Sequence, residues 1–184
     1  MARCPGKIHI IGSVGSGKTW LAGQAAERLS LPHYQTDNMV WMRTARADIR
    51  NPDEIRSAIL QSVLSQKKWI IEGVHHRWLS ESFRQADVII YLDPPASKRR
   101  NRIISRFFRQ RLGLETGNYK QSLWDLLQLL RWNREFDGQS RPDIMSLLQP
   151  YEHKLIVLDD SSGLEPYLTE WTAQAEVRLE AAGD

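Results

Sequence analysis

The stretch that decides the fold runs from residue 7 to residue 19 and reads Lys7-Ile8-His9-Ile10-Ile11-Gly12-Ser13-Val14-Gly15-Ser16-Gly17-Lys18-Thr19. Its first part is a short β-branched run, which predicts a buried strand over 7–12. Its second part fits the spacing G-x-x-x-x-G-K-S/T in full and leads into a predicted helix over 18–29. A strand, a glycine-rich turn and a helix in this order are typical of a phosphate-binding loop, or P-loop.

Each part of this loop has its own predicted chemical role. The glycines let the backbone curl, so that successive N–H groups point at phosphate oxygens. Lys18 is placed to reach the β- and γ-phosphates of a nucleotide, and the Thr19 hydroxyl to bind Mg²⁺. We therefore expect ATP and Mg²⁺ as ligands, with a nucleotide-binding set that includes Gly12, Ser13, Val14, Gly15, Ser16, Gly17, Lys18 and Thr19.

The rest of the chain alternates between strand and helix patterns. Four more strands are expected, at residues 33–36, 69–73, 87–92 and 155–158. Residues 42–54 are polar and loop-like, and Asn51-Pro52-Asp53-Glu54 at their end is expected to begin a helix, with proline and acids in its first turn. This alternation predicts a single α/β domain over residues 1–184, with a five-stranded parallel sheet and helices on both of its faces. Ligands of such a fold sit at the carboxyl ends of the strands, where Asp37, Glu72, Asp93 and Asp159 fall.

Composition narrows the class of protein. The chain has 184 residues, of which 41% are hydrophobic and 26% are charged, so it is neither disordered nor embedded in a membrane. The N-terminus has no signal-peptide pattern, and a cytoplasmic protein is expected. Cys4 is the only cysteine, which excludes an internal disulfide and a cysteine-built zinc site.

Positive charge is concentrated in one predicted helix. The net charge is +3, and seven basic residues crowd the stretch from residue 98 to residue 111: Lys98, Arg99, Arg100, Arg102, Arg106, Arg109 and Arg111. Such a cluster suits phosphate-bearing ligands, from a nucleotide to a nucleic acid. The alternative is a helix face that only meets solvent.

Three segments resemble a known group of proteins. They are Ile8–Thr19, the spacing Asp37…Trp41, and Trp69-Ile70-Ile71-Glu72-Gly73-Val74-His75-His76. They look like the adenylate-kinase-related proteins named "DNA topology modulation protein", which are small P-loop proteins similar to kinases. The resemblance runs over nearly the whole chain.

A wider resemblance links the chain to nucleoside monophosphate kinases. Leu92-Asp93-Pro94-Pro95, followed by Arg102 and Arg106, is similar to their fourth strand and lid entry. The resemblance implies that Arg102 lies against the base, that Arg106 holds phosphate, and that Asp159 borders the adenine. It also implies a helical lid over residues 107–142, in which one of Arg131, Arg134 and Arg141 stabilises the transferred phosphoryl group, and Arg134 and Arg141 are favoured because they flank a hinge near Gly138. Their usual Asp-Gly-Phe-Pro-Arg motif is replaced here by residues 72–76, which speaks against a nucleoside monophosphate as acceptor.

The residues and the resemblance together predict an ATP-dependent kinase for a small molecule, with the acceptor between Asp37, Trp41 and Glu72. Asp37 would orient the acceptor hydroxyl and take its proton, unless it is a helix cap or a solvated turn residue. Glu72 would bind Mg²⁺ together with Thr19, or act as the base in place of Asp37. The expected catalytic set is Lys18, Asp37, Glu72, Arg106, Arg134 and Arg141.

Two other functions remain open at the level of sequence. One is a nucleotide-gated regulator that binds DNA through the basic stretch, although no DNA-binding motif is present. The other is an ATPase or nucleotide sensor without a small acceptor. The sequence does not name the acceptor, does not separate ATP from GTP, and leaves both a monomer and a homodimer open.

Overall fold

The computed structural model describes residues 4–43, 48–115 and 122–181. Its centre is a sheet of five strands: β1 (Lys7–Gly12), β2 (His33–Gln35), β5 (Trp69–Gly73), β6 (Val88–Leu92) and β7 (Leu155–Leu158). All neighbouring strands are parallel, and they lie side by side in the order β2-β5-β1-β6-β7. The predicted five-stranded parallel sheet is confirmed, and the strand before the P-loop occupies its middle.

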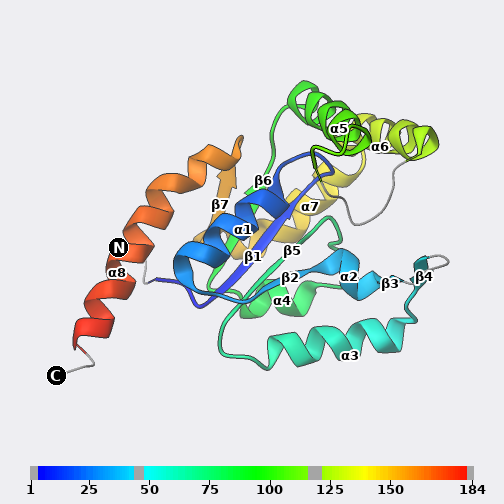
Figure 1. Cartoon of the computed structure of the whole chain (residues 1–184). Coiled ribbons are helices and arrows are strands. Elements are labelled where there is room, and N and C mark those ends of the chain that lie inside the picture. The colour runs from blue at the N-terminus through cyan, green and yellow to red at the C-terminus, as the bar shows by residue number, and fades with distance from the viewer. Residues whose placement is uncertain (1–3, 44–47, 116–121, 182–184) are drawn as a thin grey trace.

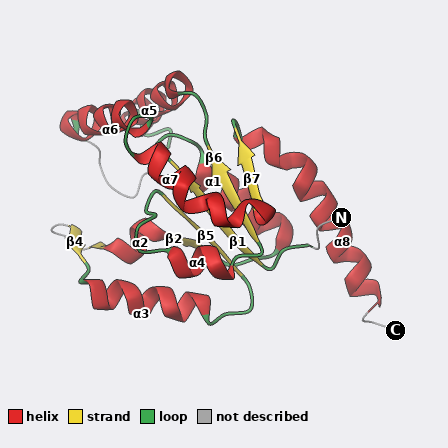
Figure 2. Cartoon of the chain, turned by 180° about the vertical axis from the view of Figure 1, so that it is seen from behind, coloured by secondary structure: helices red, strands yellow, loops and turns green. Residues whose placement is uncertain are grey.

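Helices cover both faces of the sheet (Figures 1 and 2). Helices α1 (Lys18–Leu29) and α8 (Glu165–Ala181) pack on one face. The other face is covered by α3 (Asp53–Leu64), α4 (Ser80–Gln85) and α7 (Ser140–Leu148). Two short 3-10 helices, η1 (Gln149–Lys154) and η2 (Ser161–Leu164), flank β7.

Alternation along β1 explains how one strand supports two hydrophobic cores. Ile8 and Ile10 are buried with residues of α1 and α8, whereas Ile11 is buried with residues of α3, α4 and α7. Successive side chains of a strand point to opposite faces, so a central strand must be apolar on both. Full burial of one such aliphatic side chain contributes about 1.5–3 kcal/mol. The P-loop therefore starts from a firmly packed strand.

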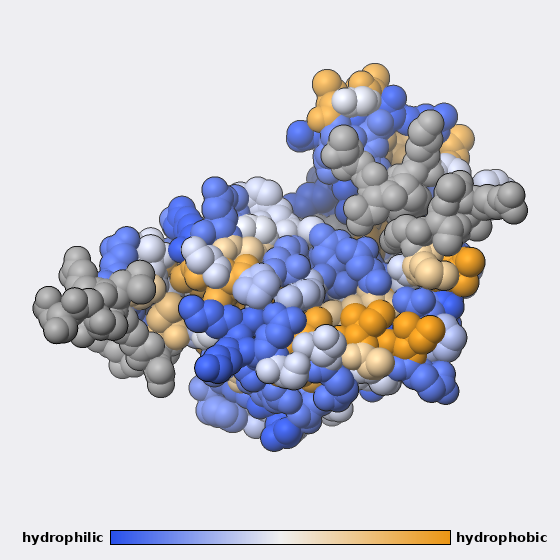
Figure 3. Space-filling view, turned by 60° about the horizontal axis from the view of Figure 1, so that its bottom comes forward, coloured by the Kyte–Doolittle hydropathy of each residue, from blue (hydrophilic) through white to orange (hydrophobic). Residues whose placement is uncertain are grey.

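Helices α5 (Ala96–Arg111) and α6 (Leu123–Phe136) pack on each other and stand away from the sheet. We call this pair the α5–α6 lobe; Figure 3 shows it projecting from the body of the molecule. It covers much of the predicted lid over residues 107–142, of which residues 116–121 lie outside the described ranges.

Arg99 attaches α5 to α6 and to the segment that follows β6, and its position corrects the interpretation of the basic stretch. The side chain is only 1% exposed. Its Nε donates to Asn133 Oδ1 (2.8 Å), its Nη2 to Asp137 Oδ1 (2.7 Å), and its Nη1 to the carbonyl oxygen of Pro94 (3.0 Å). Arg99 is thus neither a ligand-facing cation nor part of a solvated helix face, because its hydrogen bonds join α5 to residues that lie 34 and 38 positions later.

Two local predictions were wrong. Part of the region expected to be a loop over residues 42–54 forms an antiparallel strand pair, β3 (Trp41–Arg43) with β4 (Asp48–Arg50), whereas α3 begins at Asp53 as predicted. The second predicted strand ends one residue early, because Thr36 begins helix α2 (Thr36–Val40). Asp37 therefore lies in the first turn of a short helix.

Candidate active site

The P-loop lies between β1 and α1 and adopts backbone conformations that only glycine accepts readily. Gly15 and Gly17 have φ angles of 73° and 98°, in the left-handed region. At Gly12, a Cβ atom would lie 2.5 Å from the carbonyl oxygen of Leu92 on the neighbouring strand. The loop conformation thus depends on these glycines, and residue 18 opens α1 as predicted.

Thr19 and Glu72 meet beside the loop. The Thr19 hydroxyl donates a hydrogen bond of 2.9 Å to Glu72 Oε1, and Glu72 lies on β5, which pairs directly with β1. Glu72 is buried, and its second oxygen, Oε2, has no hydrogen-bond partner in the described part of the chain. Burial raises the pKa of Glu72, against the opposing effects of Lys18 and of the Thr19 hydrogen bond. An under-satisfied buried carboxylate is a group that a cation would stabilise.

Lys18 lies within the electrostatic reach of two acidic residues, Glu72 and Asp37. Its Nζ donates to the carbonyl oxygen of Ser13 at 3.2 Å. Burial lowers its pKa, the negative charges of Glu72 and Asp37 act to raise it, and the positive charge of Arg106 acts to lower it. One ammonium group thus lies within the electrostatic reach of two carboxylates and one guanidinium.

The donors present at this point fit Mg²⁺. A hydroxyl and a carboxylate are hard oxygen ligands, and Mg²⁺ typically takes one or two protein ligands and completes its shell with water and phosphate oxygens. Across residues 4–43, 48–115 and 122–181, no group of three or more His, Cys, Asp or Glu side chains is arranged to hold a metal ion. The site thus suits an ion that arrives with a phosphate ligand better than a fully protein-held ion.

Asp37 acts electrostatically on both Lys18 and Glu72 and lies next to a histidine. Its Oδ1 is 3.3 Å from Nε2 of His75, a residue in the turn after β5. Trp41, which begins β3 four residues after Asp37, is 37% exposed. The two predicted acceptor residues Asp37 and Trp41 therefore lie on the α2–β3 side of the site.

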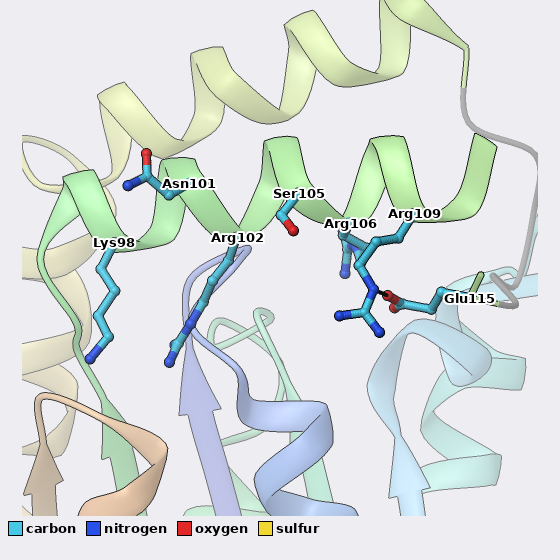
Figure 4. Close-up of a pocket in the computed structure, with 7 residues that line it drawn as sticks. All are labelled: Lys98, Asn101, Arg102, Ser105, Arg106, Arg109 and Glu115. Atoms are coloured by element: carbon cyan, nitrogen blue, oxygen red, sulfur yellow. Dashed lines mark ion pairs between the residues drawn. The ribbon is translucent and has the colours of Figure 1, made fainter. Parts of the chain in front are cut away.

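A cleft of about 400 Å³ lies along the underside of α5 and is lined by residues of that helix and by Glu115. Figure 4 shows Lys98, Arg102, Ser105 and Arg106 pointing into it from one face of the helix, while Asn101 points the other way. Arg109 and Glu115 form an ion pair of 3.4 Å at one end. The basic stretch therefore presents part of its charge toward the P-loop.

Arg102 connects α5 to the P-loop and to the turn after β7. Its Nη1 donates to the carbonyl oxygen of Ser16, and its Nη2 donates to Asp160 Oδ1 at 3.1 Å. Lys98 forms an ion pair with the same carboxylate. Asp159, the residue predicted to border the base, is exposed, whereas its neighbour Asp160 makes these contacts.

The two predicted lid arginines lie apart from the loop. Arg141 lies in the first turn of α7 and its Nε donates to Asp93 Oδ2 at 2.7 Å, while Arg134 is exposed on α6. Within the described residues, no hydrogen bond or ion pair joins either arginine to residues 12–19. Arg106 is nearer, since its charge acts on Lys18 and its Nε is buried without a hydrogen-bond partner in the same part of the chain.

Three residues that the structure brings to the site or its supports, Asp160, His75 and Arg99, were not in the predicted site set. Asp160 could have been noticed, because Asp159 and Asp160 are adjacent at the end of a strand. The contacts of His75 and Arg99 could not be predicted from the sequence. His75 meets Asp37 only through the register of β2 and β5, and Arg99 meets residues 133–137 only through the packing of α6 on α5.

Comparisons with known proteins support the fold. No protein-family model matches the sequence. The chain is 29% identical over 135 residues to a Bacillus subtilis (strain 168) protein described as "Uncharacterized protein YqaC", covering 71% of this chain and 72% of that protein.

Among solved structures, a gluconokinase from Sinorhizobium meliloti 1021 matches with a TM-score of 0.50 and 16% identity over 99% of both chains. A shikimate kinase from Acinetobacter baumannii in complex with shikimate matches with a TM-score of 0.44 and 21% identity, over 79% of this chain and 95% of that chain. At 16% identity the likeness to the gluconokinase concerns the fold alone: the chain has an α/β fold of the kind found in small P-loop kinases. No helix in the described ranges is both long and apolar enough to cross a membrane.

Proposed function

We propose that this protein is an ATP-dependent kinase that phosphorylates a hydroxyl group of a small molecule. The observation that carries the proposal is the cluster at the carboxyl edge of the sheet. Lys18 opens α1, the Thr19 hydroxyl is bound to buried Glu72, and Asp37 lies within electrostatic reach of both charged residues. A cation for phosphates and a carboxylate for an acceptor hydroxyl are the groups that phosphoryl transfer requires.

In this proposal the nucleotide lies along residues 12–19, with its phosphates against the backbone N–H groups and Lys18. Arg102 and Arg106 would approach it from α5, and the α5–α6 lobe would serve as the lid. Thr19 and Glu72 would hold Mg²⁺, which supplies positive charge to neutralise the phosphate oxygens. These residues bind and orient the reactants, and positioning together with electrostatics provides most of the catalysis of phosphoryl transfer.

The chemical step joins the acceptor to the terminal phosphoryl group. The acceptor oxygen forms a bond to the γ-phosphorus while the bond from that phosphorus to the β,γ-bridging oxygen breaks, and its electron pair leaves with ADP. The proton of the acceptor hydroxyl passes to a carboxylate. Asp37 suits this role better than Glu72, because Glu72 already accepts the Thr19 hydrogen bond and is buried beside Lys18.

The resemblance to the "DNA topology modulation protein" group suggests a DNA-binding regulator instead. The basic stretch supports this alternative weakly, because several of its side chains are already engaged within the protein. Arg99 is buried in the attachment of the lobe, and Lys98 and Arg102 are engaged by Asp160. These are three of the seven basic residues on which DNA binding would depend.

The experiment is a measurement of Mg·ATP consumption by the purified protein, with and without a panel of nucleosides, nucleoside monophosphates and sugar acids. A kinase is expected to show strong stimulation by one class of compound, together with the phosphorylated product. Slow ATP hydrolysis that no compound stimulates would overturn the proposal in favour of an ATPase or nucleotide sensor. Salt-dependent binding of duplex DNA without any stimulation would favour the regulator.

A further inference from the structure

The segments after β2 and after β5 are held close together because the Thr36 side chain packs on the backbone of Gly73. Gly73 ends β5 and lies against Thr36, the first residue of α2: a Cβ atom on Gly73 would lie 1.7 Å from Thr36 Oγ1. The parallel register places Gln35 beside Glu72 just before this point. The residues that follow, Asp37 on one side and 74–76 on the other, therefore emerge next to each other.

Asp37 and His75 meet at this junction. His75 Nε2 lies 3.3 Å from Asp37 Oδ1, and the two side chains are 31% and 54% exposed, so both can be reached by a small molecule. The His75 ring also lies beside the ring of Trp78, with 6.2 Å between the centroids. The imidazole is thus held from one side by a ring and from the other by the carboxylate.

We propose that His75 is a positioning residue that orients the Asp37 carboxylate toward the acceptor hydroxyl. This inference rests on the proposed function, in which Asp37 receives the proton of that hydroxyl. A half-exposed aspartate samples several side-chain orientations, and a contact to one of its oxygens restricts them. Proton transfer needs hydrogen-bond distance, and a displacement of about 1 Å can cost about 10²-fold in rate.

In this proposal Asp37 is the catalytic base and His75 is the group that orients it. The acceptor oxygen bonds to the γ-phosphorus, the bond to the β,γ-bridging oxygen breaks, and the proton goes to Asp37. His75 takes no part in the bonds that form or break. Its contribution appears in the rate of the acceptor reaction and leaves the nucleotide contacts of residues 12–19 unchanged.

The neighbouring histidine offers a matched control. Both ring nitrogens of His76 are buried, and among the described residues no ion pair joins this ring to Asp37. Two adjacent histidines in one turn therefore differ in the one contact that the proposal concerns.

The test compares His75→Ala, His75→Gln and His76→Gln with the unchanged protein, using the compound that gives the strongest stimulation in the panel. We expect His75→Ala to lower kcat for that compound by about 10–100-fold while the Kd of Mg·ATP stays within about 2-fold. His75→Gln should recover part of the rate, because its amide N–H can donate to the carboxylate, and His76→Gln should keep kcat. Thermal unfolding of each variant separates these effects from misfolding.

A double-mutant cycle provides the decisive measurement. If His75 acts through Asp37, His75→Ala should add almost nothing to the loss caused by Asp37→Asn. Full kcat in His75→Ala, or losses that simply multiply, would overturn the inference while leaving the kinase proposal intact. If no compound stimulates the unchanged protein, the kinase proposal itself fails and this inference fails with it.

Discussion

The two halves of the candidate active site are built in different ways. The nucleotide half is a single run of eight residues, 12–19, whose shape depends on the backbone of Gly12, Gly15 and Gly17. The acceptor half is assembled from α2, from the turn after β5 and from β3. Its side chains are partly exposed, and their mutual contacts depend on the register of two strands.

This difference separates what each half can tolerate. Backbone N–H groups of a loop are positioned by the chain itself, so substitution of most side chains there leaves the phosphate site in place. The acceptor half relies on side chains instead of backbone groups, so the orientation of Asp37 depends on the residues around it. The acceptor half is therefore where a small change should alter substrate choice without altering nucleotide binding.

The largest expected effect lies in the nucleotide half. Replacing Lys18 by Ala removes the ammonium group aimed at the phosphates, and we expect turnover to fall by at least about 10²–10³-fold. The fold should persist, because the only hydrogen bond from Nζ to the protein goes to the carbonyl oxygen of Ser13 in the described part of the chain. Lys67→Ala, at an exposed lysine before β5, is the matched control. Turnover in Lys18→Ala equal to that of Lys67→Ala would contradict the proposed mechanism.

A second, smaller effect tests the junction that supports the acceptor half. In Gly73→Ala the new methyl group would collide with Thr36, so β5 and α2 must separate. Overpacking of this kind costs about 1–3 kcal/mol of the free energy of unfolding. We also expect acceptor stimulation to fall more than Mg·ATP affinity, since Asp37 and His75 lie on the two separated segments.

Gly23→Ala is the control for this change. Gly23 lies inside α1, and nothing stands within 4 Å of a Cβ placed there. Alanine in a helix interior is about 0.5–1 kcal/mol more favourable than glycine, so this variant should be more stable than the unchanged protein in chemical denaturation. If both alanines had the same effect on stability, the close approach of β5 and α2 would not be tight.

The same contrast explains how much of the molecule could be predicted from its sequence. The P-loop and the five strands were predictable because each depends on a local pattern, a run of β-branched residues or a glycine spacing. The hairpin of β3 and β4 was missed because each strand has only three residues and the residues of β4 are all exposed. No hydrophobic alternation marks such strands.

The α5–α6 lobe shows why the remainder was beyond local patterns. The leucines of α6 predict a packed stripe, yet Leu123 and Leu127 are 61% and 58% exposed. The helix instead buries Leu129, Phe136 and the polar Asn133, because Asn133 binds Arg99 of α5. Which face of a helix is buried depends on the element that packs against it. For the same reason, composition alone does not distinguish the buried Arg99 from the six other basic residues of the stretch 98–111. The Asp37–His75 contact was unpredictable for the same reason.

The smallest expected effect concerns Glu72, which lies where the two halves meet. Because burial raises its pKa above 4.5, the folded protein holds this proton more tightly than the unfolded chain does. The unfolded chain loses the proton first as the pH rises, so the nucleotide-free protein loses stability from pH 4.5 up to the raised pKa.

Glu72→Gln keeps an oxygen that can accept the Thr19 hydrogen bond but cannot ionise, so the nucleotide-free variant should gain stability relative to the unchanged protein as the pH rises above about 5 toward the raised pKa of Glu72. The gain should reach on the order of 1 kcal/mol in denaturant titrations. Glu81→Gln is the control, because hydrogen bonds from Arg84 lower the pKa of Glu81 to about 2 and its contribution is constant over that range. A difference for Glu72→Gln that stays flat with pH would mean that the carboxylate is ionised in the folded protein without cost, so that its burial would offer Mg²⁺ no special attraction.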